Sequence, residues 1–202
     1  MSVRNTREDV VAAAGRLFAE RGYHGTSMRA LGRELGLLGS SLYAHVGGKQ
    51  ELLVEVVERG ARFFEEAAQG AGRADTAASR LEVLIAGHIG VMLDHRAEVR
   101  TFLNEAAALD TGVLRRIIGA RDRYESRFRE VLAAGVATGE FRSDLDPKVG
   151  AIFILSILNA VDRWFHEGRP LTRRQLTDSI MMFVGAGIGE PGRLAATART
   201  AR

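Results

Sequence analysis

The sequence holds 202 residues, of which 46% are hydrophobic and 26% are charged, with a formal net charge of +3. This composition is ordinary for a globular protein in water, and the length suits one or two small domains. It offers no stretch near the ~20 apolar residues of a membrane span, no apolar signal-peptide core at its start, and no cysteine for disulfides or thiolate metal sites. We therefore expect a cytoplasmic protein without membrane contact.

The positive charge is concentrated near the N-terminus. Residues 1–50 contain seven Lys and Arg but four Asp and Glu, whereas basic and acidic residues balance over residues 51–202. A basic segment favours a phosphate-bearing partner through counterion release. An excess of three charges is also compatible with an ordinary surface.

Apolar residues recur at the three- and four-residue spacing of helices along the chain, and no segment alternates as a strand does. Helix start signals support this reading: Thr6 with Asp9, Asp146 before Pro147, and Thr172 with Gln175. The sequence predicts an all-α protein of about nine helices, over residues 6–21, 28–35, 39–46, 49 to about 69, 76–93, 99–108, 113–137, 147–166 and 172–188.

The second and third predicted helices form the most informative stretch. The helix over 28–35 is amphipathic, and Gly36 marks a tight break after it. The helix over 39–46 turns only Leu42 and Val46 inward and leaves small or polar residues outside. Two short helices joined in this way predict a helix-turn-helix, whose second helix enters a DNA major groove.

Three segments, LFAERGYHGTSM, RALGRELG and SSLYAHVGGKQELL, carry a family pattern. The matching positions are Tyr23, Thr26, Gly36, Tyr43, His45, Lys49 and Leu52. With them, residues 6–64 resemble the tetracycline-repressor (TetR) family of bacterial transcription regulators. The chain departs from the pattern at Leu38, where a small capping Ser or Thr is usual, and at Val46, where Phe is frequent. The resemblance implies an N-terminal DNA-binding domain and a C-terminal domain whose last two helices form a homodimer.

Eight residues are predicted to face DNA: Thr26, Arg29, Gly39, Ser40, Ser41, Tyr43, His45 and Lys49. The hydroxyl, imidazole and ammonium groups of Thr26, Tyr43, His45 and Lys49 suit phosphate contacts. Ser40 and Ser41 are short enough to reach base edges, Gly39 permits close backbone approach, and Arg29 can pair bidentately with guanine. The alternatives are a solvated surface arginine at position 29 and a half-buried packing role for Tyr43.

Polar residues on apolar helix faces mark the predicted effector site, which comprises His88, Met92, Asn104, Arg121, Tyr124, Phe128, Asn159 and Arg163. Such a site suits an apolar ligand with an anionic or amide group. The alternative is internal ion pairing of Arg121 or Arg163 with Asp162 or Glu105, because a buried charge is costly unless paired. The segments GEFRSDLDP and NAVDRWFHEGRPLTRRQL weakly resemble family members that regulate lipid and acyl-CoA metabolism.

These features predict three parts: a DNA-binding domain over 1–50, an effector-binding and dimerisation domain over 51–190, and a tail over 191–202. The predicted function is a repressor that binds a palindromic operator as a homodimer and is released by a small, largely apolar effector. The helix that begins at Lys49 links the two predicted domains and is expected to act as the hinge between them. No catalytic motif, metal cluster or cofactor loop is evident. The alternatives are an architectural DNA-binding protein without an effector and a drug-sensing repressor.

Overall fold

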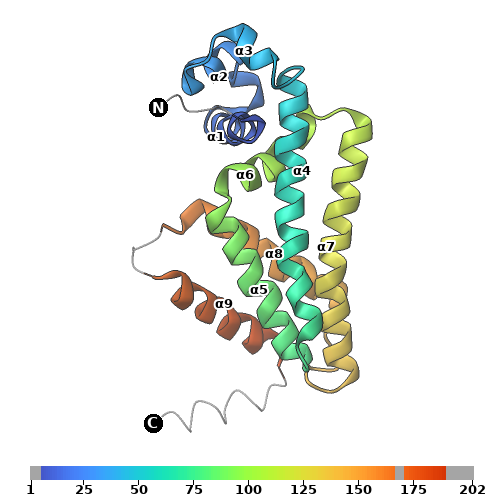
Figure 1. Cartoon of the computed structure of the whole chain (residues 1–202). Helices are drawn as coiled ribbons and strands as arrows, with labels where there is room; N and C mark the ends of the chain where they lie inside the picture. The colour runs from blue at the N-terminus through green and yellow to red at the C-terminus, as the bar shows by residue number, and fades with distance from the viewer. Residues whose placement is uncertain (1–5, 167–170, 190–202) are drawn as a thin grey trace. The chain divides into compact units, whose positions relative to one another are not determined.

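The computed structural model describes residues 6–166 and 171–189, which form nine α-helices and two short 3-10 helices (Figure 1). The all-α prediction is confirmed. The helices and their bounds are α1 (Arg7–Gly25), α2 (Met28–Leu35), α3 (Gly39–Tyr43), α4 (Lys49–Ala68), η1 (Gln69–Arg73), α5 (Ala77–Asp94), α6 (Arg96–Asn104), η2 (Ala106–Ala108), α7 (Thr111–Ala137), α8 (Pro147–Trp164) and α9 (Arg173–Ile188). The predicted tail over 191–202 lies outside the described residues.

The chain divides into two compact units. The first comprises the described residues within 1–63 and 95–121, and the second those within 64–94 and 122–202. The first unit extends past the predicted boundary at residue 50 to residue 63, and it also includes α6, which packs against α1. Two long helices, α4 and α7, supply residues to both units.

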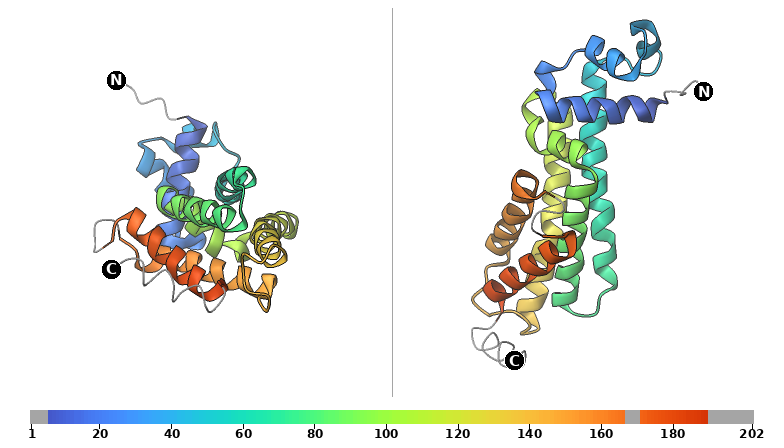
Figure 2. Two further views of the ribbon diagram at one scale, coloured as in Figure 1. Left: turned by 90° about the horizontal axis from the view of Figure 1, so that it is seen from below. Right: turned by 90° about the vertical axis from the view of Figure 1, so that its left-hand side faces the viewer.

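The first unit is built on α1, which packs against α2 and α6 (Figure 2). Thr6 and Asp9 form the predicted capping box at its start. The core includes Leu17, Phe18, Leu31, Leu42, Val46, Leu53, Val56 and Val99. Gly60 of α4 brings that helix close to α6, since a Cβ there would lie 2.9 Å from the Cβ of Phe102. Any side chain at Gly60 would push the two helices apart.

In the second unit α5 is the central helix and packs against η1, α8 and α9 (Figure 2). Asp146 caps α8 by accepting hydrogen bonds from the N–H groups of Lys148 and Val149, with Pro147 in the first turn as predicted. Thr172 and Gln175 form the predicted capping box of α9. The core includes Phe64, Leu84, Ile85, Ile89, Phe128, Leu132, Ile154 and Leu158.

Candidate nucleic-acid interface and effector site

The predicted helix-turn-helix is present in the first unit, where α2 and α3 follow one another across a tight turn (Figure 1). Ser27 caps α2, since its hydroxyl accepts a hydrogen bond from the N–H of Ala30 at 3.1 Å. Gly36 ends α2 in the left-handed region with φ 64°, and the N–H of Leu37 donates to the carbonyl of Gly32 at 2.8 Å. Glycine suits this conformation because a Cβ disfavours positive φ.

Three of the predicted DNA-facing side chains are fully available on the surface. Arg29 and Ser41 are exposed, and Tyr43 at the end of α3 is 56% exposed. His45 is half-buried, while the exposure of Gly39 and Ser40 is outside what the structure describes. At 56% exposure the Tyr43 side chain can reach a phosphate, and the alternative of a half-buried packing residue also remains compatible with this placement.

Thr26 and Lys49 are instead used inside the first unit. The Thr26 side chain is 3% exposed, and its hydroxyl donates to the carbonyls of Leu17 and Gly22 at 3.2 and 3.0 Å. The Lys49 ammonium donates to the carbonyls of Tyr23 and Thr26 at 2.8 Å each and lies 4.1 Å from the centre of the Tyr23 ring. The phosphate contact expected of the Thr26 hydroxyl does not fit this placement, because its one proton is already donated.

Sequence reasoning missed Arg7, whose side chain connects the end of the DNA-binding motif to the start of α4. Its guanidinium donates to the carbonyl of His45 at 2.8 Å and to carboxylates of Glu51 and Glu55 at 2.7 Å each. Glu51 in turn accepts a hydrogen bond from the N–H of Gly47 at 2.7 Å. The hydrogen bond from Arg7 is the main reason why the pKa of Glu51 lies below its usual value. No local pattern predicts these contacts, since the partners are 38 to 48 residues apart.

The structure brings together four of the predicted effector residues in the second unit, His88, Tyr124, Phe128 and Asn159, and buries Met92 on α5 as well. His88 is 2% exposed, and its Nδ1 lies 3.2 Å from the Tyr124 hydroxyl. The Phe64 ring lies 4.7 Å from that of His88 and 5.3 Å from that of Tyr124 between centres. Two polar rings thus lie within an aromatic core, and we call His88, Tyr124, Phe64 and Phe128 the aromatic cluster.

Burial sets the charge state of this cluster. It lowers the pKa of His88 to about 3, and the neighbouring Asn159 side chain opposes the shift only in part. It also raises the pKa of the Tyr124 hydroxyl, with a smaller contribution from the charge of Glu65. Both rings are therefore neutral near pH 7. His88 Nε2 is buried and makes no hydrogen bond of normal geometry, although the Asn159 side chain lies close enough to act on the pKa of the ring.

The other three predicted effector residues lie elsewhere. Asn104 is exposed at the end of α6, and Arg163 is exposed on α8. Arg121 belongs to the first unit, where its guanidinium donates to the carbonyl of Phe102 and stacks 4.6 Å from the centre of that ring. Burial lowers the pKa of Arg121, and its Nε makes no hydrogen bond. The carbonyl and the ring take the place of the carboxylate that sequence reasoning considered as its partner.

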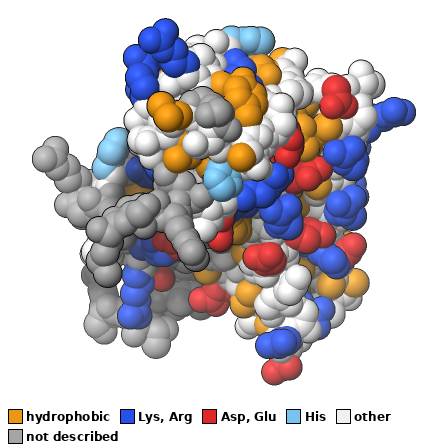
Figure 3. Space-filling view, turned by 45° about the horizontal axis from the view of Figure 1, so that its top comes forward, with side chains coloured by type: hydrophobic (Ala, Val, Ile, Leu, Met, Phe, Trp, Pro, Cys, Tyr) orange, Lys and Arg blue, Asp and Glu red, His pale blue; other side chains and the backbone are white. Residues whose placement is uncertain are grey.

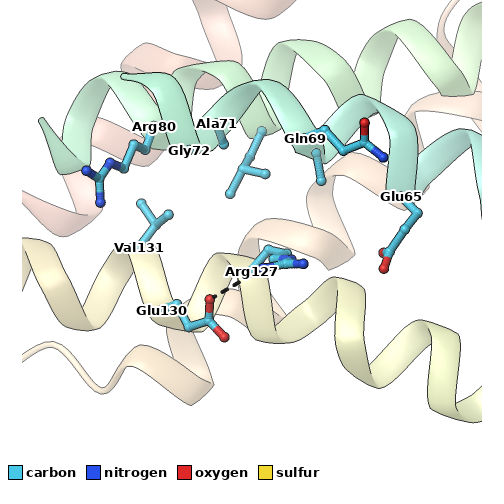
Figure 4. A pocket seen from close by; sticks show the side chains of 10 residues that line it. Glu65, Gln69, Ala71, Gly72, Arg80, Arg127, Glu130 and Val131 are labelled. Carbon is cyan, nitrogen blue, oxygen red and sulfur yellow. Dashed lines mark ion pairs between the residues drawn. The ribbon is translucent and has the colours of Figure 1, made fainter. Parts of the chain in front are cut away.

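A pocket of about 430 Å³ opens in the second unit (Figure 4). Its lining residues come from α4, η1, α5 and α7: Glu65, Ala68, Gln69, Ala71, Gly72, Arg80, Leu84, Arg127, Glu130 and Val131. Charged side chains lie around it, and the Arg127 guanidinium approaches Glu130 at 4.0 Å (Figure 4). Leu84 and Val131 are buried. The pocket therefore combines a polar mouth with an apolar floor.

Helices α8 and α9 carry large hydrophobic side chains on the surface of the single chain. They are Val149, Ile152, Phe153 and Trp164 on α8, and Met182 and Phe183 on α9. Phe153, Met182 and Phe183 are each at least 65% exposed. One face of α8 is therefore uncovered in the single chain.

A helix-turn-helix with an exposed second helix, together with a larger helical unit, defines a DNA-binding regulator. Residues 10–56 match the family model described as bacterial regulatory proteins, tetR family. Residues 74–188 match the model described as tetracyclin repressor-like, C-terminal domain. The chain belongs to the TetR family, as its sequence pattern indicated.

Similar proteins extend over nearly the whole chain. It is 30% identical to the HTH-type transcriptional repressor KstR2 of Mycolicibacterium smegmatis, over 90% of each chain. The structure of ketosteroid transcriptional regulator KstR2 of Mycobacterium tuberculosis superposes with a TM-score of 0.86 at 26% identity, covering 94% of this chain and 97% of that one. AibR in complex with isovaleryl coenzyme A and operator DNA gives 0.78 at 27% identity, covering 89% and 96%.

The chain is thus a DNA-binding transcriptional repressor of the TetR family and not an enzyme. None of the helices that the structure describes is long and apolar enough to cross a membrane.

Proposed function

We propose that this repressor binds a palindromic operator as a homodimer in the bacterial cytoplasm, and that a small, largely apolar effector with a polar or anionic group releases it. The observation that carries the effector proposal is the aromatic cluster, where the buried Nε2 of His88 makes no normal hydrogen bond. An unsatisfied buried polar atom is costly, and a ligand group that pairs with it removes that cost. AibR, a similar protein, was solved with isovaleryl coenzyme A and operator DNA.

The pocket offers the effector a route to this cluster. Three lining residues, Ala68, Leu84 and Val131, stand on α4, α5 and α7. One helical turn further along each helix lie Phe64, His88 and Phe128, at spacings of four, four and three residues. We propose that the apolar part of the effector displaces the side chains of Ala68, Leu84 and Val131 and so reaches the aromatic cluster. Its polar part stays at the charged mouth of the pocket. A thioester of coenzyme A, a fatty acid and an apolar drug remain the chemical classes to compare.

A blocking substitution tests this route. Gly72 lines the mouth, and a Cβ there would meet no atom within 4 Å, so Gly72→Leu is expected to narrow the pocket without disturbing the core. The probes are isovaleryl-, decanoyl- and palmitoyl-coenzyme A and decanoate, each titrated into protein bound to fluorescent operator DNA. We expect a probe that releases the wild type to require at least tenfold more ligand with Gly72→Leu. The control Ala86→Leu, at an exposed position of α5, should respond as the wild type does. Equal release from all three proteins contradicts the route.

The homodimer proposal rests on the uncovered faces of α8 and α9. Burying one large hydrophobic side chain contributes about 1.5–3 kcal/mol, so six of them provide a strong driving force for a second copy to cover them. A two-fold dimer also matches a palindromic operator, because each half-site then meets one recognition helix. Gly187 is exposed and a Cβ there would meet nothing within 4 Å, which leaves α9 open to close approach.

Charge introduced into this face tests the dimer. Phe153→Glu is expected to give monomers in light-scattering measurements and to abolish operator binding. The control Ile118→Glu adds the same charge at another exposed hydrophobic position, 47% exposed on α7, and should remain dimeric. A dimeric Phe153→Glu protein with wild-type affinity for DNA contradicts the proposed interface.

Release requires that the effector prefer one of two conformations, since a ligand with equal affinity for both shifts nothing. We propose that α4 transmits this preference. It begins at Lys49, whose ammonium is bound to the carbonyls of Tyr23 and Thr26, and it ends at Ala68 in the pocket lining. A shift of α4 would thus act on the DNA-binding motif at one end and on the effector at the other.

A further inference from the structure

Leu38 is the most exposed of the large hydrophobic side chains in the described part of the chain, at 79%. It directly precedes α3, and its carbonyl accepts a hydrogen bond from the N–H of Leu42 at 3.2 Å. This bond makes Leu38 the residue at the N-terminal boundary of the recognition helix. The next two apolar residues of the motif, Leu42 and Val46, are buried at 0% and 3% exposure. Leu38 is therefore no part of the hydrophobic core of the unit.

Leucine is a poor residue for this position on two counts. Helix boundaries of this kind favour Ser, Thr, Asp or Asn, whose oxygen accepts a hydrogen bond from a free backbone N–H, and leucine has no such oxygen. Its apolar surface is also left in water. Figure 3 shows hydrophobic side chains exposed beside Lys and Arg side chains in the upper part of the view. A contact made only in the DNA complex would offset both costs.

The DNA major groove presents one apolar group, the C5-methyl of thymine. In helix-turn-helix proteins the N-terminal residues of the recognition helix contact base edges. We propose that Leu38 reads a thymine in each half-site by packing against its C5-methyl group, and so determines specificity at that base pair. The inference rests on the DNA-binding function of the family and not on the effector proposal.

Removal of the methyl group alone tests the proposal. Operator duplexes are first selected from a random-sequence library with the wild-type protein. Each thymine is then replaced by deoxyuridine, which lacks the C5-methyl but keeps the base pairing, and affinity is measured by fluorescence anisotropy. We expect one thymine per half-site whose replacement weakens wild-type binding about fourfold, the loss expected for one buried methyl-sized group. Replacement in both half-sites should weaken binding roughly fifteenfold.

Leu38→Ala completes the comparison. Leu38→Ala should bind the thymine operator about as weakly as the wild type binds the deoxyuridine operator. Replacing thymine with deoxyuridine should then not weaken the binding of this variant further. Ile118→Ala, a truncation at an exposed position of α7, should keep the wild-type response. An enriched operator whose thymines are all insensitive to deoxyuridine overturns the proposal, as does undiminished sensitivity in Leu38→Ala. A library without any enriched sequence overturns this inference together with the palindromic operator.

Discussion

Acid should destabilise this protein through one buried residue, His88. Its folded-state pKa is about 3, against 6.5 for the ordinary side chain, because burial penalises the imidazolium. The native state therefore keeps the ring neutral, while the unfolded chain binds a proton below pH 6.5. The contribution of His88 to the free energy of unfolding is constant above pH 6.5 and falls as the pH drops from 6.5 toward 3.

The loss at pH 5 is about 2 kcal/mol, since each pH unit below the unfolded pKa contributes at most ~1.4 kcal/mol. Urea unfolding of wild type and His88→Gln, followed by circular dichroism at fixed protein concentration, measures it between pH 7.5 and 5. A glutamine side chain cannot titrate, so the variant should lose about 2 kcal/mol less over this range. Other titrating groups are common to both proteins and cancel in the comparison. An identical pH dependence of the two proteins would refute the assignment.

Three further predictions concern single side chains. Arg7→Ala should weaken operator binding because it frees the carbonyl of His45 and the carboxylate of Glu51. The loss of stability should be small, since these ion pairs are on the surface, and equal affinity for DNA would contradict the positioning role. Tyr43→Ala should weaken binding to all DNA sequences alike in mobility-shift assays, whereas a change in stability alone would exclude a phosphate contact. Arg121→Ala should leave release by effector unchanged, because its guanidinium bonds to Phe102 in the first unit; loss of release with operator binding retained would return Arg121 to the effector site.

Local signals predicted all nine helices of the described residues, but two boundaries were wrong: the helix predicted over 39–46 ends at Tyr43, and the helix predicted over 99–108 spans Arg96–Asn104. The capping pairs Thr6 with Asp9 and Thr172 with Gln175 both form, and Gly36 adopts the left-handed conformation expected at the break. Each of these devices acts within four residues of the chain, so the sequence alone contains the whole interaction. The family pattern around α2 and α3 rests on the same short-range information.

Side-chain roles were harder to predict because they depend on distant partners. Thr26 and Lys49 have the right chemistry for phosphate contacts, yet their polar atoms bond to backbone carbonyls of the first unit. Arg7 lies 44 residues from Glu51 in sequence, and no spacing rule links them. Periodicity places a residue on a helix face, but the fold decides what that face meets.

The same limit explains the helix α8. Its nearly continuous apolar sequence is typical of a helix buried on every side, but Val149, Phe153 and Trp164 are exposed in the single chain. Apolar sequence cannot distinguish a protein core from a subunit interface, because both exclude water. Within the effector site, the residues predicted on α5, α7 and α8 include a group that meets in the core, while Asn104 and Arg163 are exposed.

The proposed function is tested most directly by measuring operator affinity with and without effector. A duplex selected by the wild-type protein is titrated with that protein by fluorescence anisotropy, alone and in the presence of isovaleryl-, decanoyl- or palmitoyl-coenzyme A, decanoate or an apolar drug. We predict binding to this duplex at least a thousandfold tighter than to random DNA, one dimer per palindrome, and at least tenfold weaker binding with one of the effector classes. Equal affinity for all duplexes, unaltered by every compound, would indicate an architectural DNA-binding protein and contradict the account.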